Sequence, residues 1–322
     1  MPEPAGGPPP QPGTFVLAVN PSAGRGLGLQ HAHRAAGVLR TGGDEVVVLS
    51  AENLPALVEA VRDRLRGCAL SARALVVVGG DGMVQAGLRV LVELAEQGVD
   101  VPLGVVPCGT GNDLARHFRV PPRDPEAAAG RVLRLLDDPV PRMLDVGRVR
   151  FADGRTALFG TALCAGFDAV VTERANRLRQ IGGSAKYLAA VLAELPRLRS
   201  VHYRLELTDA AGRVRTEERE GMLLNVANTS SVGGGLRIVP GARHDDGLLE
   251  LFTVAPLGRA RLLYLFPTLF TGRHVDLEPV RIEQVRSVRV DATAVTAYAD
   301  GELMGPLPAQ VDVLPAAVRV LA

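Results

Sequence analysis

The sequence predicts an α/β domain built on an open parallel sheet, followed by an antiparallel β-sandwich domain. Residues 74–78 form a short apolar run that ends in glycines and is followed by a helical pattern of apolar residues over 84–95. A β-branched run of this kind is typical of a strand in a buried parallel sheet. Past residue 140 short strands separated by turns replace the alternation of strand and helix. That change indicates a second, antiparallel domain.

The first part of the chain alternates strands with helices. The predicted strands are residues 15–19, 46–49, 74–78 and 103–106, and helices are predicted over 27–40 and 54–66. Ligands of such sheets bind beyond the carboxyl ends of the strands.

The second part is mostly extended. Strands are predicted at residues 143–149, 157–162, 203–207, 222–227, 248–252 and 295–299, with helices near 167–180 and 184–195 and a last strand pair at 311–313 and 318–321. Short strands between turns are typical of a sandwich.

Length and charge limit the classes of function. With 322 residues, 47% of them hydrophobic, the chain can bury the cores of two domains. The net charge of +1, from 36 basic and 35 acidic residues, argues against a nucleic-acid partner. Cys68, Cys108 and Cys164 are widely spaced without a metal-ligand pattern, which fits a reducing cytosol.

No targeting or membrane-spanning segment is recognisable. Residues 1–13 are rich in proline and glycine and lack the features of a signal peptide, so we expect a disordered tail. The longest apolar stretch, residues 262–270, is far shorter than the roughly 20 residues that span a bilayer. We expect a cytoplasmic protein that contacts the inner face of the membrane only peripherally.

Three glycine-rich loops follow predicted strands: residues 20–26, 79–82 and 107–116. Glycines let backbone N–H groups approach a ligand closely, and the helix N-terminus after such a loop favours anions. Asp81 lies within the second loop, and a carboxylate beside phosphates requires a cation such as Mg²⁺ between them. The loops therefore predict a site for a metal–nucleotide complex, although a purely structural turn would use similar residues.

The order of these motifs resembles the diacylglycerol kinase catalytic domain family, which includes bacterial soluble diacylglycerol kinases and the sphingosine and ceramide kinases. The resemblance rests on Asn20-Pro21-x-x-Gly24, Gly79-Gly80-Asp81-Gly82 and Gly109-Thr110-Gly111-Asn112-Asp113, and continues through Pro240-Gly241-Ala242 and Asp245-Asp246-Gly247 to Asp300-Gly301-Glu302. It covers nearly the whole chain.

The resemblance implies a kinase that transfers the γ-phosphoryl group of ATP, bound with Mg²⁺, to a lipid hydroxyl, with diacylglycerol as the leading acceptor. It also implies that the last strands return to the first domain. The predicted division is a tail at 1–13, an ATP-binding domain at 14–142 with 309–322, and a lipid-substrate domain at 143–308.

Carried over to this chain, the resemblance gives a set of nucleotide-binding residues, with Ser50 added as a weaker contact at the end of the second strand. They are Asn20, Pro21, Ser22, Ala23, Gly24, Ser50, Gly79, Gly80, Asp81, Gly82, Met83, Val84, Gln85 and Thr110. Asp81, expected on a solvent-facing turn, would orient the Mg²⁺ that is bound to the phosphates.

The chain departs from the family directly after the second loop. The family usually has threonine after the Gly-Gly-Asp-Gly turn and often asparagine and glutamate soon after, whereas this chain has Met83, Gln85 and Ala86. Met83 removes a hydroxyl that could contact phosphate. Either Ser22 or Thr110 supplies that contact, or activity is reduced.

Asp300 is the predicted proton acceptor, with Glu302 in reserve. A lipid hydroxyl is a poor nucleophile, and a carboxylate within hydrogen-bond reach can both orient it and take its proton. From the residues alone an Asp-Gly hairpin turn explains the motif as well, and the resemblance places it across the cleft from the nucleotide loops. We expect Asp300 on an exposed turn.

A second metal site is implied only by the resemblance. It would be structural, holding Mg²⁺ through the carboxylate of Asp246 and the backbone carbonyls of Arg243 and Leu248. The alternative is an ordinary turn that leads into a strand.

Two further features have two interpretations each. Lys186, the only lysine, contacts a phosphate or is simply solvated. Residues 259–274 combine leucine and phenylalanine with arginines at both ends, so the stretch lies at a membrane surface or packs on the sandwich core.

Other functions stay open. The acceptor could be a sphingoid base, ceramide, phosphatidylglycerol or NAD, and a catalytically weak protein that binds lipid or nucleotide would explain Met83. The sequence does not decide the oligomeric state, and a homodimer is compatible with it.

Overall fold

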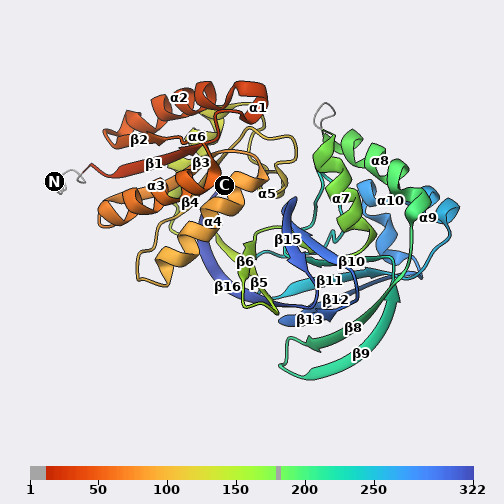
Figure 1. The fold of residues 1–322 in the computed structure, drawn as a ribbon. Helices are drawn as coiled ribbons and strands as arrows, with labels where there is room; N and C mark the ends of the chain where they lie inside the picture. Colours follow the sequence, from red (N-terminus) through yellow and green to blue (C-terminus); the bar gives the residue numbers. More distant parts are fainter. Residues whose placement is uncertain (1–11, 179–182) are drawn as a thin grey trace, which may run out of the picture.

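The structure, a computed structural model, describes residues 12–178 and 183–322 (Figure 1). The predicted tail at 1–13 therefore lies outside the described residues except for its last two positions. Within the described ranges, no helix has the length and apolar character needed to cross a bilayer.

The first part contains the predicted parallel sheet. Its strands, in spatial order, are β2 (Glu45–Leu49), β1 (Thr14–Val19), β3 (Ala72–Gly79) and β4 (Leu103–Pro107). All three pairings between them are parallel. β1 and β4 are buried along their whole length, which explains their continuous apolar sequence.

Helices cover both faces of this sheet (Figure 1). They are α2 (Gly28–Leu39), α3 (Leu54–Gly67), α4 (Asp81–Ala95) and α6 (Pro125–Leu136), with the short α1 (Ala23–Gly26), η1 (Arg40–Gly42) and α5 (Asp113–His117). α2 packs against α6 and α3 packs against α4. The side chains of Asn53 and Asp124 accept N–H groups in the first turns of α3 and α6, as N-caps do.

The second part is built on two sheets that enclose an apolar core. One is antiparallel and has the order β12 (Val280–Val285), β11 (Leu249–Val254), β10 (Leu223–Ala227), β7 (Ala162–Cys164), β14 (Thr296–Ala299) and β15 (Glu302–Pro306). The other contains β5 (Met143–Phe151), β6 (Thr156–Phe159), β8 (Val201–Thr208), β9 (Val214–Gly221), β13 (Ser287–Asp291) and β16 (Ala309–Leu321). Fully buried side chains such as Phe159, Tyr203 and Leu251 fill the core. The predicted fold class is confirmed.

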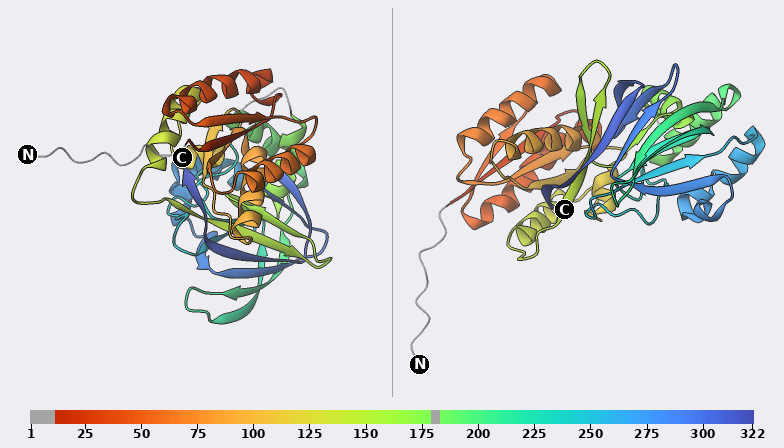
Figure 2. Two further views of the ribbon diagram at one scale, coloured as in Figure 1. Left: turned by 90° about the vertical axis from the view of Figure 1, so that its left-hand side faces the viewer. Right: turned by 90° about the horizontal axis from the view of Figure 1, so that it is seen from below.

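β16 joins the two parts (Figure 2). It pairs antiparallel with β5 and β13, and then its residues Val320 and Leu321 pair parallel with β4. The two strands predicted at 311–313 and 318–321 are therefore one strand, interrupted by a register shift between Leu314 and Val318. Because β16 pairs with strands of both parts, the domain boundary at 309 stays a prediction.

Helices cover the six-stranded sheet on the side away from that core. They are α7 (Phe167–Arg177), α8 (Gly183–Glu194), α9 (Arg259–Leu265) and α10 (Thr268–Thr271), with short turns at η2 (Leu195–Arg197) and η3 (Arg273–Asp276). The stretch 259–274 is thus broken at Pro267 and Gly272, because proline lacks an N–H donor and Gly272 has a φ of 76°.

Candidate active site

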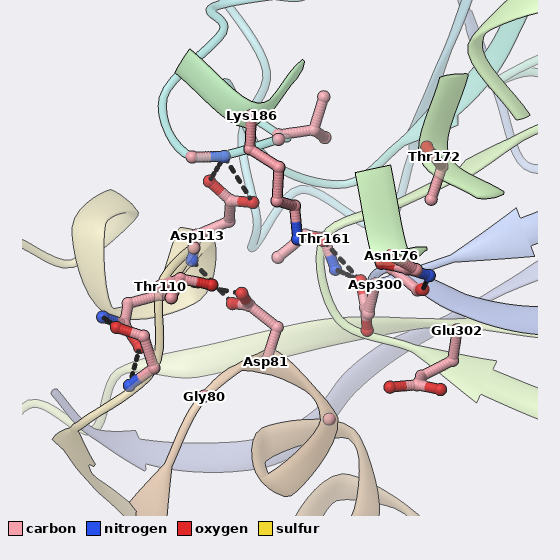
Figure 3. Close-up of a pocket in the computed structure, with 18 of the residues that line it drawn as sticks. Gly80, Asp81, Thr110, Asp113, Thr161, Thr172, Asn176, Lys186, Asp300 and Glu302 are labelled. Carbon is pink, nitrogen blue, oxygen red and sulfur yellow. Dashed lines mark hydrogen bonds between the residues drawn. The ribbon is translucent and has the colours of Figure 1, made fainter. Parts of the chain in front are cut away.

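A cavity of about 1920 Å³ lies where the glycine loops of the first part face the helices of the second. The loops after β1, β3 and β4 line one side, as predicted. The turn between β14 and β15 lines another, so the cavity brings Asp81 and Asp300 into one site (Figure 3).

The glycine loops pack directly against one another. A Cβ on Gly109 would lie 2.4 Å from the Cα of Gly80, and a Cβ on Gly24 would lie 2.5 Å from Cys108 Sγ. Only glycine allows the backbones to approach this closely. The result is a floor of backbone with the N-terminus of the 15-residue helix α4, an arrangement that favours phosphate.

Asp81 holds two of these loops together. Its Oδ2 accepts the N–H of Asn112 at 2.8 Å, and its Oδ1 accepts the N–H of Asp113 at 2.6 Å. Burial, with repulsion from Asp300 as a smaller cause, raises the pKa of Asp81 to about 6. The expectation of a solvent-facing turn was wrong, because the loop after β4 folds over this carboxylate.

Asp113 is a residue of the site that the sequence analysis did not propose. Its carboxylate accepts the N–H of Gly234, 2.9 Å from Oδ1 and 3.1 Å from Oδ2, and so ties α5 to the loop before β11. Burial and the nearby charge of Asp81 raise the pKa of Asp113 to about 7. The signal was available, since Asp113 ends the Gly-Thr-Gly-Asn-Asp motif and residues 233–235 are all glycine.

Asp300 lies in a tight hairpin turn with its carboxylate directed inward. β14 and β15 pair up to Ala299 and Glu302, and Asp300 and Gly301 have φ values of 50° and 84°, as in a type I′ turn. The carboxylate accepts N–H groups of Gly160 at 2.7 Å and Thr161 at 2.9 Å, and the Thr161 hydroxyl also donates to it. Asp300 is half-buried rather than exposed, because these donors draw the carboxylate toward β7.

Burial raises the pKa of Asp300, while the hydrogen bonds from Thr161 and Gly160 act in the opposite direction. The hydrogen bonds therefore fix the orientation of the carboxylate without removing its ability to take a proton.

Glu302 and Asn176 complete this corner of the cavity. Glu302 is exposed, and its Oε1 would lie 3.1 Å from a Cβ on Gly82, so its carboxylate faces the first turn of α4. Asn176 of α7 donates to the carbonyl of Gly301 at 2.6 Å, which anchors the turn that carries Asp300.

Lys186 extends from α8 toward Asp81 and Asp300 (Figure 3). The side chain is half-buried, and burial lowers the pKa of its ammonium although the charge of Asp81 acts to raise it. The structure therefore places this lysine in the cavity.

Most of the predicted nucleotide-binding residues line the cavity, and so do both predicted candidates for the base. The lining members are Asn20, Pro21, Ser22, Ala23, Gly24, Gly80, Asp81, Gly82, Met83, Thr110, Asp300 and Glu302. Met83 is 5% exposed, and its side chain lies against Gly79.

Four predicted residues are not part of the lining: Ser50, Gly79, Val84 and Gln85. Val84 is buried in the core of the first part, and Gln85 donates to the carbonyl of Leu158 at 3.2 Å. The turn of α4 directs both side chains away from the cavity.

The predicted second metal site lies elsewhere, in the turn before β11. Asp246 Oδ1 accepts the N–H of Leu248 at 3.1 Å, as in an ordinary turn. Buried Asp145 accepts the N–H groups of Gly247 at 2.7 Å and Ala316 at 2.6 Å. A cation bound by Asp246 with the carbonyls of Arg243 and Leu248 stays a prediction.

Within residues 12–178 and 183–322, no group of three or more His, Cys, Asp and Glu side chains is placed to hold a metal ion. Burial raises the pKa values of Asp81, Asp113 and Asp300, and the charge of Asp300 adds to the rise at the other two carboxyls. Mg²⁺ is commonly held by one or two carboxylates together with substrate phosphates. The cavity therefore fits an Mg²⁺ that arrives with a nucleotide.

The far end of the cavity is apolar and belongs to the second part. Its walls come from α8, α9, α10, β11 and the loop before β11, and include Val191, Ile238, Phe252, Leu262 and Phe266. One cavity thus joins a polar, glycine-lined end to an apolar end, and Asp300 and Glu302 line it between these two ends.

Two family models match the chain. The model of the diacylglycerol kinase catalytic domain matches residues 14–149, and the model of the YegS C-terminal NAD kinase beta sandwich-like domain matches residues 161–322.

Curated relatives and solved structures agree with these models. A diacylglycerol kinase of Mycobacterium tuberculosis is 39% identical over 314 residues, which cover 96% of this chain and 95% of the relative. A probable lipid kinase YegS-like of Stenotrophomonas maltophilia is 28% identical over 76% of this chain and 77% of its own length. The crystal structure of a putative diacylglycerol kinase from Bacillus anthracis superposes with a TM-score of 0.73 over 97% of both chains. Because the two sequences are only 18% identical, this superposition shows similarity of fold alone.

Proposed function

Because the chain belongs to the diacylglycerol kinase family of lipid kinases, we propose that it transfers the γ-phosphoryl group of MgATP to a lipid hydroxyl, with diacylglycerol as the acceptor. The observation that carries this proposal is the single cavity with a glycine-lined polar end, an apolar end and carboxylates between them.

The polar end suits the nucleotide. Asn20, Ser22 and Gly24 form one wall, and Gly80, Gly82 and the N-terminus of α4 form the floor. The side-chain oxygen Oδ1 of Asn20 accepts both the N–H and the hydroxyl of Ser22, at 3.0 and 2.7 Å, which fixes this loop. Backbone N–H groups and the helix dipole would hold the phosphates, and Lys186 would neutralise part of their charge.

Asp81 would orient Mg²⁺ on the phosphates, either directly or through a water molecule. Mg²⁺ neutralises charge that builds up on the transferred phosphoryl group. Asp81 is already fixed by the N–H groups of Asn112 and Asp113, so it needs little rearrangement to do so.

Asp300 would act on the acceptor. The lipid hydroxyl oxygen forms a bond to the γ-phosphorus while the bond from that phosphorus to the β,γ-bridging oxygen breaks, which releases ADP. The hydroxyl proton passes to the Asp300 carboxylate, and Glu302 is the alternative acceptor because it lies on the same hairpin and faces Gly82.

A membrane would supply the lipid. The helices that wall the apolar end also carry exposed apolar side chains, among them Leu192 on α8 (52% exposed), Tyr264 on α9 (82%) and Phe270 on α10 (40%). Residues 251–275 contain arginines at 259, 261 and 273 and no acidic residue. Exposed aromatic and basic side chains together favour an anionic bilayer surface. Leu262 and Phe266 of the same segment are buried, so one face of this stretch packs on the core, and the exposed face is the one that would contact the membrane.

A panel of acceptors tests the proposal. Purified protein is incubated with radiolabelled ATP and Mg²⁺, and offered dioctanoylglycerol, sphingosine, ceramide, phosphatidylglycerol and NAD in parallel. Labelled phosphatidic acid as the main product is the expected result. A main product from another acceptor reassigns the substrate, and nucleotide binding without transfer to any acceptor indicates a catalytically weak binding protein.

A further inference from the structure

One carboxyl in the cavity has no role in the chemistry above. Asp168, in the first turn of α7, lines the cavity together with Asn225 of β10. The Asn225 amide nitrogen donates to Asp168 Oδ2, and the N–H of Ala169 donates to Oδ1 at 2.9 Å. The second contact is local to the helix, but the first joins residues 57 positions apart.

The register of the six-stranded sheet places this pair near Asp300, the proposed base. Asn225 lies directly opposite Cys164 of β7, and Cys164 is two residues beyond Ala162, whose N–H is 3.4 Å from Asp300 Oδ1. Two residues of strand correspond to about 7 Å. On its other side Asn225 lies opposite Phe252, which belongs to the apolar wall. The Asp168–Asn225 pair therefore stands between the base and the apolar end.

A polar pair at this position lowers the stability of the fold, and a role in ligand binding accounts for its presence. Asn225 is buried and Asp168 is half-buried, so both groups lose hydration, and their mutual hydrogen bond does not fully return that free energy. Among the residues that the structure describes, no arginine, lysine or histidine hydrogen-bonds Asp168, and burial raises the pKa of Asp168 to about 7. At neutral pH the carboxyl is thus protonated in a large fraction of molecules, and in that form it is a hydrogen-bond donor.

We propose that Asp168 and Asn225 form a subsite that hydrogen-bonds the glycerol-ester group of the acceptor. This inference rests on the proposed function. In a diacylglycerol the ester oxygens lie a few bonds from the free hydroxyl. With that hydroxyl at Asp300, the ester group lies beside Asn225 along the cavity. The acyl chains then extend past Phe252 into the apolar end. A protonated carboxyl can donate a hydrogen bond to an ester carbonyl, and the Asn225 amide adds a second polar group at the same place.

The test compares acceptor kinetics of three variants. Asp168→Ala should raise KM for dioctanoylglycerol about tenfold, the effect of one hydrogen bond, while kcat and KM for MgATP change less than twofold. Asp168→Asn keeps a donor and should restore most of the affinity. A matched control is Glu250→Gln. Glu250 is a buried carboxyl on the same sheet that accepts the amide of Gln284 at 3.1 Å, outside the cavity lining.

The possible results distinguish failure of the proposed subsite from failure of the proposed kinase function. An unchanged KM for dioctanoylglycerol in Asp168→Ala, or an equal loss of kcat with every acceptor, overturns the subsite while the kinase assignment stands. If the wild-type protein phosphorylates no glycerolipid, the proposed function itself fails. If Asp168→Ala does not fold, Asn225→Ala carries the same expectation, and failure of both to fold shows that the pair is part of the core and refutes the subsite.

Discussion

The backbone N–H of Asp113 donates to Asp81 Oδ1 over 2.6 Å, so the turn after β3 holds the first residue of α5. Asp113 in turn accepts the N–H of Gly234 in the second part of the chain. Through these two carboxylates the glycine loops of the first part are linked to the loop before β11 in the second part.

Replacement of Asp81 tests the metal-orienting role. Asp81→Asn should lower turnover by about 10²-fold or more at saturating MgATP, because the charge that faces the phosphates is lost. It should also lower the melting temperature slightly, since an amide nitrogen cannot accept the N–H of Asn112 or Asp113. The control is Asp100→Asn, an exposed residue. Turnover at the wild-type rate would remove Asp81 from the mechanism.

Replacement of Asp300 tests the base. Asp300→Asn should reduce kcat about 10²-fold, with nucleotide affinity near that of the wild type, as measured by steady-state kinetics and nucleotide titration. Glu302→Gln should have a smaller effect, and Asp153→Asn, on an exposed turn, should have none. The opposite order of the first two effects would transfer the role to Glu302.

Chemical labelling tests Lys186, the only lysine of the chain. An amine-reactive reagent should inactivate the protein, and MgATP should protect it, because the ammonium lies in the cavity near Asp81. Lys186→Arg keeps the charge and should remain active but resist the reagent. This resistance distinguishes modification of Lys186 from modification of the α-amino group. Inactivation of Lys186→Arg at the wild-type rate would contradict the assignment.

Vesicle binding tests the membrane-facing helices. The double variant Tyr264→Ser, Phe270→Ser should sediment several-fold less with phosphatidylglycerol-containing vesicles than the wild type, because both side chains are exposed next to the basic segment. Its activity on dioctanoylglycerol in detergent micelles should be preserved. Val214→Ser, at an exposed position of β9 (62%), is the control. Equal sedimentation of all three proteins would show that Tyr264 and Phe270 do not contact the membrane.

The pH dependence of stability tests the buried carboxyl of Asp113. Its pKa rises from 3.8 to about 7 on folding, so between these values the native state binds more protons than the unfolded state. The free energy of unfolding should therefore fall as pH increases through this range. Asp113→Asn removes this contribution, so the melting temperature of the variant should decline less between pH 5 and pH 7.5 than that of the wild type. Parallel curves would show that Asp113 titrates normally in the folded protein.

The sequence alone was enough for the architecture and for the polar end of the cavity. Continuous apolar runs such as residues 74–78 and 103–106 bury all their side chains only in a sheet that is covered on both faces. The glycine loops that follow such parallel strands lie together at the carboxyl edge of the sheet. Asp81 was recognisable from its place in a glycine turn after a buried strand. Asp300 and Glu302 were recognised through the resemblance to the diacylglycerol kinase catalytic domain family, because their residues alone also fit an ordinary Asp-Gly turn.

The tertiary structure alone decided which side chains point into the cavity. Val84 and Gln85 follow directly on the glycine turn, yet the helical period of α4 directs one into the core and the other toward β6. Asp168 and Asn225 carry no motif, and they meet only because of the register between β7 and β10 and the packing of α7 on that sheet. Local patterns specify helices, strands and turns, whereas the pairing of residues far apart in the chain depends on packing energies summed over the whole domain.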